Sequence, residues 1–523
     1  MGVGLSASLL FAAACTGAGS TAVPPTPAGS TAPSPGSTAA SSLPNGTRAP
    51  AAGIAWTSCG ERLDCASVPM PLDWEQPDGQ KVELAVIRHR ASKPEQRIGT
   101  IFADPGGPGD TGVGFVRDGG DDLDAWGDGR FDWIGWDPRG TYSSTPVMCF
   151  PSKDAEASFW AGVRIPSTAP ESEALSQRTT DLARRCGDIM GPVLSHISTT
   201  DTVRDLDALR ALVGEETITY VGLSYGTLIG QMYANLFPGR VRAMLLDGIV
   251  DPVAWTTDAE LRTANSVAST DEVFQQFLAK CEAAGPAHCA LAGHGETPAA
   301  RVDRLFARAK QAPIPAPGAT PPGELAFSDL QVASFAPLRD PDLWPAYAEQ
   351  LNAAVEGDPS ALATAAQQAR TPAAWSEATK STAISCLDAA AAKPVAQWPM
   401  VIGDLTARST MAGPILGWWT WAPCASDWPA QSDDRFTGPW NARTEVPILL
   451  IGTRFDPNTA YENAVRSEKL LGNAVLLTHE GYGHLSIKDP STCTEQWRVR
   501  YLVDLDAPAP GTVCQADKQP FAG

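Results

Sequence analysis

The pattern of apolar and polar positions changes character along the chain. Runs of β-branched and aromatic residues, such as 218–221, precede segments with apolar residues at helical spacing, such as 227–237. The first pattern predicts buried strands and the second predicts helices. Further strands are expected over 100–103, from 131, and over 241–246, 446–452 and 474–478, with another helix over 201–212. This alternation is typical of a mostly parallel α/β sheet.

Residues 254–425 interrupt the alternation. They are rich in Ala, Pro and Trp, and they are expected to be mostly helical. We interpret them as a cap inserted between strands, which divides an α/β core into residues 51–253 and 426–523. The chain has 523 residues and 43% hydrophobic composition, enough for one large domain with such an insertion.

The N-terminal residues are typical of an exported protein. Residues 1–15 predict an export segment, because the apolar run over 3–14 is too short to span a bilayer. The run ends at Ala13-Ala14-Cys15, which resembles the bacterial lipoprotein cleavage box, so lipidation of Cys15 is expected; a plain cleaved signal is the alternative. Residues 16–50 are almost entirely Gly, Ala, Ser, Thr and Pro and predict a disordered tether.

Cysteine usage also favours export. Ten cysteines remain besides Cys15, none in a C-x-x-C pair, and an even number is typical of disulfides in an oxidising compartment. Sequential pairing is expected, because successive cysteines are close or bracket one element: Cys59–Cys65, Cys149–Cys186, Cys281–Cys289, Cys386–Cys424 and Cys493–Cys514. A metal site at His288, Cys289 and His294 is weighed and set aside. No metal and no organic cofactor is expected.

The net charge of −20 and the pI of about 4.7 bear on possible partners. No cluster of Lys and Arg interleaved with aromatic residues occurs, so nucleic acid is a poor candidate. The acidity is explained by solubility, or by attraction of a cationic group on a substrate.

A G-x-S-x-G pentapeptide, Gly222-Leu-Ser224-Tyr225-Gly226, lies between the strand predicted at 218–221 and the helix predicted at 227–237. That context is the one in which a sharp, strained turn exposes a serine Oγ and flanking glycines allow close packing. Ser224 is therefore predicted to be a nucleophile; a Gly-Ser turn with a solvated hydroxyl is the alternative.

A second glycine-rich loop, 105–109, follows the strand at 100–103. Gly107-x-Gly109-x-x-Gly112, with Asp137 about 25 residues further on, also fits a dinucleotide-binding fingerprint. Two observations argue against a dinucleotide site. The loop contains two prolines, and the Gly and Asp content of 113–129 predicts no long helix after the third glycine. We favour an oxyanion loop, with Gly107 (or Gly106) and Tyr225 as backbone donors.

Two charged residues follow the strand that begins at 131. Asp137 and Arg139, in Asp-Pro-Arg-Gly, are expected to form a structural ion pair beside the active site rather than to act in catalysis.

An acid and a histidine follow the last two predicted strands. Asp456 comes after 446–452 and His484 after 474–478, which gives the chain order Ser, Asp, His. The histidine would take the proton of Ser224, and the acid would orient the imidazole. His479 and Asp247 are the rivals. Thr459 is expected either to hydrogen-bond Asp456 or only to cap a turn.

These segments together resemble a known family. The chain is similar to the actinobacterial tripeptidyl-aminopeptidase-like α/β-hydrolases, relatives of the proline iminopeptidases, and most of all to cell-envelope serine protease lipoproteins of mycobacteria. The matching segments, spread over about 55–520, are 104–109, 137–140, 222–227, 383–386, 456–457 and 481–484. Ser224, Asp456 and His484 fall on the family's triad positions, whereas Asp104 and Asp110 depart from its usual loop.

The resemblance implies an α/β-hydrolase fold and a serine hydrolase that releases short peptides from N-termini or cleaves peptides internally. Binding a free α-amino group would need acids in the cap, for which Asp271, Glu272 and Glu282 are available. A carboxylesterase with the same triad stays open, since both reactions pass through an oxyanion intermediate. An inactive hydrolase fold that serves as an envelope binding protein is a more distant alternative.

Overall fold

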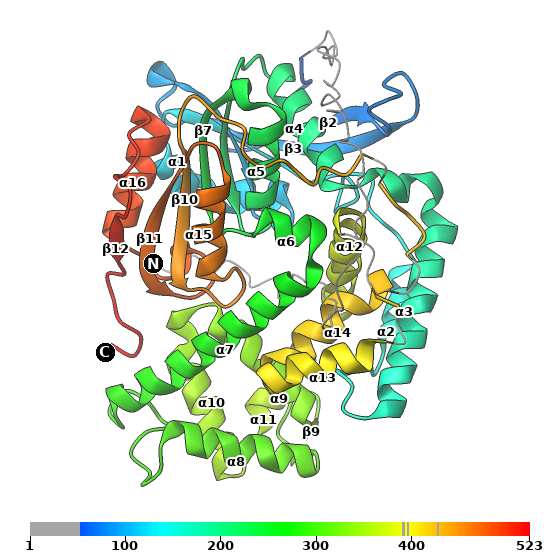
Figure 1. The fold of residues 1–523 in the computed structure, drawn as a ribbon, viewed down its shortest axis with the longest axis vertical. Helices are drawn as coiled ribbons and strands as arrows, with labels where there is room; N and C mark the ends of the chain where they lie inside the picture. The colour runs from blue at the N-terminus through cyan, green and yellow to red at the C-terminus, as the bar shows by residue number, and fades with distance from the viewer. Residues whose placement is uncertain (1–52, 390–392, 395–396, 426–427, 433, 523) are drawn as a thin grey trace, which may run out of the picture.

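The computed structural model describes residues 53–389, 393–394, 397–425, 428–432 and 434–522 (Figure 1). The export segment at 1–15, Cys15 and the tether at 16–50 lie outside the described residues. Within the described chain, no helix combines the length and the apolar character that crossing a membrane requires.

One sheet of ten strands organises the fold. In spatial order the strands are β1 (Thr57–Gly60), β2 (Leu63–Pro71), β3 (Lys81–His89), β5 (Phe131–Trp136), β4 (Gly99–Asp104), β6 (Ile218–Leu223), β7 (Val241–Asp247), β10 (Ile448–Phe455), β11 (Ala474–Tyr482) and β12 (Val513–Gln515). The pairs from β5 to β12 are parallel, and β1, β2 and β3 add an antiparallel edge. The sheet is therefore mostly parallel, as predicted.

Helices cover both faces of the sheet, which explains why its central strands are continuous apolar runs. Successive residues of β7 point to opposite faces. Leu245 belongs to the cluster that includes α1 (Gly112–Trp126) and α16 (Thr492–Asp504). Leu246 belongs to the cluster formed with α4 (Thr199–Leu212), α5 (Gly226–Leu236) and α15 (Tyr461–Leu470).

A helical layer lies between β7 and β10 in the sequence and occupies the lower half of Figure 1. Its helices are α6 (Pro252–Thr257), α7 (Ala259–Ala284), α8 (Pro298–Gln311), α9 (Phe327–Leu338), α10 (Trp344–Glu356), α11 (Ser360–Gln368), α12 (Pro372–Asp388), α13 (Trp398–Arg408) and α14 (Ala412–Ala425), with a short hairpin of β8 (Ile314–Ala316) and β9 (Gly323–Leu325). It has its own hydrophobic cluster. We call residues 254–425 the cap, and these bounds stay a prediction.

Two further helices outside those bounds pack against the cap. They are α2 (Lys153–Trp160) and α3 (Ala169–Met190), which follow β5 in the sequence. Helix α2 contacts α12 and α3 contacts α14, and Trp160 stacks on Trp375 with ring centroids 4.4 Å apart. The segment between β5 and α4 thus belongs spatially to the helical layer, although the sequence pattern placed it in the core.

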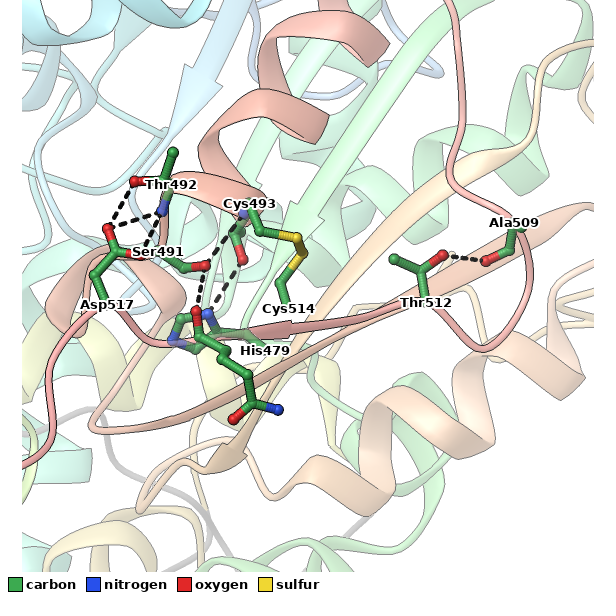
Figure 2. Close-up of a disulfide and its surroundings, with 10 residues drawn as sticks. His479, Ser491, Thr492, Cys493, Ala509, Thr512, Cys514 and Asp517 are labelled. Atoms are coloured by element: carbon green, nitrogen blue, oxygen red, sulfur yellow. Dashed lines mark hydrogen bonds between the residues drawn. A yellow bond between two sulfur atoms is a disulfide. The ribbon is translucent and has the colours of Figure 1, made fainter.

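Five disulfides are present: Cys59–Cys65, Cys149–Cys186, Cys281–Cys289, Cys386–Cys424 and Cys493–Cys514. These are the five sequential pairs expected from the sequence. Figure 2 shows the last of them joining the first turn of α16 to β12. Such bonds are typical of exported proteins.

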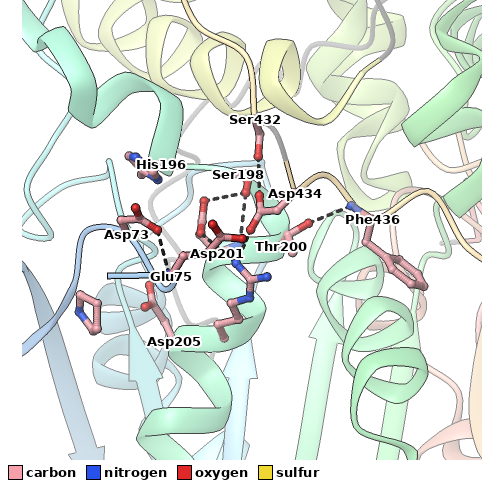
Figure 3. A network of polar contacts seen from close by, with 12 residues as sticks. Asp73, Glu75, His196, Ser198, Thr200, Asp201, Asp205, Ser432, Asp434 and Phe436 are labelled. Carbon is pink, nitrogen blue, oxygen red and sulfur yellow. Dashed lines mark hydrogen bonds and ion pairs between the residues drawn. The ribbon is translucent and has the colours of Figure 1, made fainter. Parts of the chain in front are cut away.

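A polar network anchors the segment that returns from the cap to the sheet (Figure 3). Asp434 forms an ion pair with Arg204 of α4 and accepts a hydrogen bond from Ser432. The N–H of Phe436 donates to Oγ1 of Thr200 at 3.1 Å. The start of α4 therefore holds the chain that leads from α14 back to β10.

The prediction that Asp137 and Arg139 form an ion pair with each other was wrong. Arg139 instead binds both carboxylate oxygens of Asp205 on α4, at 2.7 and 2.5 Å, and both side chains are fully buried. Its remaining N–H groups donate to three backbone carbonyls, those of Pro71, Leu72 and His196. Asp137 accepts hydrogen bonds from the Thr111 hydroxyl, at 2.6 Å, and from two backbone N–H groups.

The expectation that no long helix opens after Gly112 holds only in part: α1 begins at Gly112 and reaches Trp126, but Gly120, with φ +36° and ψ −115°, breaks it into two shorter helical segments. Thr111 caps it by accepting from the N–H of Gly114 at 2.8 Å. Val116 and Leu123 bury its apolar side against the sheet. A helix cap and burial outweigh the cost of about 1 kcal/mol for each glycine in a helix.

Candidate active site

The turn between β6 and α5 presents Ser224. Its φ is +52°, in the left-handed region that non-glycine residues rarely adopt. The two motif glycines are required by close packing. A Cβ on Gly222 would lie 2.4 Å from the carbonyl oxygen of Gly226, and a Cβ on Gly226 would lie 2.5 Å from that of Asp104. The local sequence thus forces the sharp turn that the motif predicts.

His484 reaches Ser224 from the loop after β11. Its Nε2 lies 3.0 Å from Oγ of Ser224. Two backbone hydrogen bonds fix the loop: the N–H of Gly483 donates to the carbonyl of Phe455 at 3.0 Å, and the N–H of His484 donates to that of Arg339 at 2.8 Å. Arg339 follows α9, so the cap itself holds the histidine loop in place.

Asp456 completes a hydrogen-bonded chain. Nδ1 of His484 lies 3.0 Å from each of its carboxylate oxygens. The carboxylate also accepts from the N–H groups of Asn458, Thr459 and Leu485 and from the Thr459 hydroxyl, at 2.8 to 3.2 Å. Burial alone would raise the pKa of Asp456, but His484 and these donors outweigh it and lower the pKa. The carboxylate is therefore ionised at neutral pH.

The rival residues have other partners. Asp247 accepts from the N–H and Oγ of Ser486, at 3.1 and 2.5 Å, and from Arg498 at 3.3 Å. His479 is buried with Nδ1 3.2 Å from the Thr494 hydroxyl, at the start of α16 (Figure 2). Burial and the nearby charge of Arg498 lower the pKa of His479 to about 4, so its imidazole is neutral. The N–H of Ser224 donates to the backbone carbonyl of Asp247 at 2.9 Å. Among the described residues, neither rival's side chain is hydrogen-bonded to the imidazole of His484 or to Oγ of Ser224.

The glycine-rich loop lies directly against this turn. The N–H of Gly106 donates to Oδ1 of Asp104 at 2.9 Å, whereas Gly107 lines the same cavity as Ser224 and Tyr225. Within the described part of the chain, the N–H groups of Gly107 and Tyr225 have no acceptor. The structure thus brings together the residues predicted for an oxyanion hole, and it favours Gly107 over Gly106. Because the loop packs against the turn that holds Ser224, the oxyanion interpretation is favoured over the dinucleotide interpretation.

A cavity opens beside Ser224. Its apolar lining is Val250, Trp255, Phe335, Leu416 and Pro457, and its polar lining includes Asp251, Arg262, Ser266, Asn458, Thr459 and Asn463. Arg262 packs its guanidinium over the Trp255 ring, 3.8 Å from the centroid, and Asp251 forms an ion pair with Arg466 at 2.7 Å. The cap supplies most of the apolar surface.

The three cap acids considered for an amine lie elsewhere. Asp271 accepts from the Ser409 hydroxyl at 2.7 Å, Glu272 lies 3.6 Å from Arg454, and Glu282 is exposed. None of the three lines the cavity beside Ser224. Among the residues that the structure describes, no group of three or more His, Cys, Asp or Glu is arranged to hold a metal ion.

The sequence missed several residues of this region. The cavity residues of the cap, such as Trp255, Phe335 and Leu416, lie on helices without any motif. Asp104 could have been found, because an Asp followed by Pro-Gly is typical of a turn in which the carboxylate accepts the N–H two residues on. No sequence motif indicates that the backbone carbonyl of Arg339 accepts the N–H of His484.

Comparisons with known proteins identify the family. The family described as "alpha/beta hydrolase fold" matches residues 105–356, and that described as "TAP-like protein" matches residues 415–514. The chain belongs to the α/β-hydrolase family. It is 31% identical to "Serine protease Hip1" of Mycobacterium tuberculosis over 489 residues, covering 88% of this chain and 91% of the relative.

Two further relatives carry different names. The chain is 30% identical to "Tripeptidyl aminopeptidase" of Streptomyces lividans, covering 83% of this chain and 81% of the relative. It is also 30% identical to "Carboxylesterase B" of M. tuberculosis, covering 88% and 89%. All three names are those of hydrolytic enzymes, and the chain is a serine hydrolase of the α/β-hydrolase class.

Proposed function

We propose that this protein is an exported serine peptidase that acts through Ser224, His484 and Asp456 and an acyl-enzyme. The observation that carries the proposal is the continuous hydrogen-bonded chain from Ser224 Oγ through His484 to Asp456, with 3.0 Å at both steps. A serine and histidine at this distance, with an ionised acid on the far ring nitrogen, fit nucleophilic attack on a carbonyl.

Each group has a defined task in the proposed reaction. Nε2 of His484 accepts the hydroxyl proton as Ser224 Oγ attacks the carbonyl carbon, and later gives that proton to the leaving group. Asp456 holds the imidazole with Nδ1–H toward itself and stabilises the imidazolium. The N–H groups of Gly107 and Tyr225 donate to the oxygen that becomes negative. Water then attacks the acyl-enzyme with His484 as base and releases the acid.

The cavity bears on which peptides would be cleaved. Its apolar lining suits an apolar side chain next to the scissile bond. An α-amino group three residues away would lie up to about 10 Å from the scissile carbonyl. The relative named tripeptidyl aminopeptidase supports our proposal that the enzyme releases tripeptides or longer oligopeptides from N-termini.

Export and membrane attachment are part of the proposal. The five disulfides support an oxidising compartment. Lipidation of Cys15, followed by the tether at 16–50, would hold the enzyme at the outer face of the cell membrane; cleavage without lipidation would release it. Peptides or proteins outside the cell are then its substrates, and nucleic acid is not a partner.

The relative named carboxylesterase favours a second candidate, an esterase with the same three residues. Both reactions use the same oxyanion chemistry, so the triad does not decide between them. The hydrogen bond between Ser224 and His484 argues against the third alternative, an inactive envelope binding protein, because a binding protein would not need that hydrogen bond.

One panel of substrates tests the proposal. Release of a fluorophore is measured from tripeptide amides with free and with blocked N-termini and from a short-chain ester, with Ser224→Ala beside the wild type. Turnover of free-amine amides alone supports the aminopeptidase. Equal turnover of blocked amides means an endopeptidase, and turnover of the ester alone means a carboxylesterase. Activity on nothing, or full activity of Ser224→Ala, contradicts the assignment.

A further inference from the structure

Asp104 is the last residue of β4, and its side chain is fully buried under the nucleophile turn. Its Oδ1 accepts the N–H of Gly106 at 2.9 Å, and a Cβ on Gly226 would lie 2.9 Å from the same oxygen. The carboxyl group is therefore enclosed between the glycine-rich loop and the first turn of α5. No hydroxyl or charged side chain of the described chain donates to it.

Gly106 itself rests on the nucleophile turn. Its φ is +104°, and a Cβ there would lie 2.5 Å from the carbonyl oxygen of Leu223, 2.8 Å from the nitrogen of Tyr225 and 3.0 Å from Cβ of Ser224. The space in front of the Tyr225 N–H is thus left open only because residue 106 lacks a side chain. The orientation of Gly106 fixes the next peptide, which carries the N–H of Gly107.

We propose that Asp104 is a positioning residue that aims the oxyanion loop: by accepting the N–H of Gly106, it leaves the N–H of Gly107 facing the reacting carbonyl oxygen. Without this acceptor, the Gly106 N–H would be buried and unpaired, which costs about 1–3 kcal/mol, and the loop would turn to satisfy it. The inference rests on the proposed role of Ser224, because it concerns the donors that serve that nucleophile.

The charge state of Asp104 fits this role. Burial raises the pKa of Asp104 well above its usual value, and the nearby acids Asp110 and Asp137 raise it further, whereas the Gly106 N–H lowers it. The raised pKa favours the neutral form of the carboxyl group, which adds no negative charge next to an oxygen that becomes negative. A side-chain amide, which is neutral and has an acceptor oxygen in the same place, should replace it.

Three substitutions test the proposal. Asp104→Ala and Asp104→Leu both remove the acceptor. Leucine has the same branched shape as aspartate, so Asp104→Leu leaves no cavity that could destabilise the fold. Asp104→Asn keeps the acceptor. The kcat and KM of each variant are measured on the best substrate of the panel, together with the melting temperature. A stability role alone would lower the melting temperature of Asp104→Ala and leave kcat of the folded enzyme intact.

We expect Asp104→Ala and Asp104→Leu to lose about 10²–10³-fold in kcat, the loss typical of one oxyanion donor, with KM nearly unchanged. Asp104→Asn should stay close to the wild type. Full kcat in either acceptor-free variant, or equal losses in Asp104→Asn and Asp104→Ala, would overturn the inference. A wild type that turns over no substrate would instead contradict the proposed function, so the two failures are distinguishable.

Discussion

Nε2 of His484 lies 3.0 Å from Oγ of Ser224, although 260 residues separate the two in the sequence. The serine follows β6 and the histidine follows β11, two strands of the same parallel sheet. Because the carboxyl ends of parallel strands meet at one edge, distant residues that follow strand ends converge there.

The two histidines near the C-terminal end of β11 should differ in function. His484→Gln is expected to lower kcat by about 10⁴-fold or more, because it removes the base beside Ser224. His479→Gln should leave kcat close to that of the wild type, because His479 contacts Thr494 and not the serine. Steady-state kinetics of both variants check this. Loss of kcat in His479→Gln with an intact fold would contradict the assignment.

Asp456→Asn should retain the fold and lower kcat by about 10⁴-fold, because an amide no longer holds the imidazole in the productive tautomer. Asp247→Asn is the matched control at the end of a neighbouring strand. It weakens the contact with the buried Arg498 and should lower the melting temperature, while the folded enzyme keeps its kcat. The reverse result, with kcat lost only in Asp247→Asn, would make Asp247 the acid.

Thr459→Val should lower kcat by about 10- to 100-fold, because it removes a hydrogen bond to the charged Asp456 that contributes about 1.5–3 kcal/mol. Thr459→Ser keeps the hydroxyl that donates at 2.8 Å and should restore most of the rate. The measurement is kcat for both variants on one substrate. Equal rates in Thr459→Val and the wild type would mean that the threonine only caps the turn.

Arg139→Met should destabilise the protein by about 3–5 kcal/mol, because it leaves the buried Asp205 carboxylate without its partner. Arg184→Met is the control, since its ion pairs with Asp181 and Asp188 are exposed and should contribute about 1 kcal/mol or less. Urea unfolding of both variants beside the wild type measures the difference. A loss in Arg139→Met no larger than in the control would show that the buried pair is dispensable.

The stability of the wild type relative to Asp110→Asn should depend on pH. Burial raises the pKa of Asp110 to about 7, so the folded state holds a proton that the unfolded state has already lost near pH 4. The contribution of Asp110 is therefore fully present below about pH 4 and is lost as pH rises to 7, by up to about 1.4 kcal/mol per unit. The melting temperature of Asp110→Asn should therefore rise relative to that of the wild type between about pH 4 and pH 7. A difference that is constant with pH would contradict this.

The sequence predicted the site better than it predicted the surroundings. Ser224, Asp456 and His484 each follow a strand with clear hydrophobic character, and the sheet alone brings such positions together. The partner of Arg139 was missed because Asp205 lies 66 residues away, on a helix with no motif of its own. Which buried carboxylate meets a buried arginine depends on the packing of α4 against the sheet, which local patterns do not encode.

Helix α1 shows a different limit. Its glycines correctly indicated weak helix propensity, because the helix is broken at Gly120. The cap by Thr111 and the burial of Val116 and Leu123 still make the two segments on either side of the break helical. The helices α2 and α3 were missed as part of the cap layer for a related reason. The sequence of an amphipathic helix identifies its apolar face, but it does not identify the element that this face contacts.

The two strands that flank the cap in the sequence are direct neighbours in the sheet, with Leu245 of β7 opposite Leu449 of β10. The cap therefore leaves and rejoins the sheet at nearly the same place. In evolution, such an insertion can lengthen, shorten or be exchanged without moving a single strand. A change in the cap can thus reshape the cavity beside Ser224 while the residues at the strand ends stay where they are.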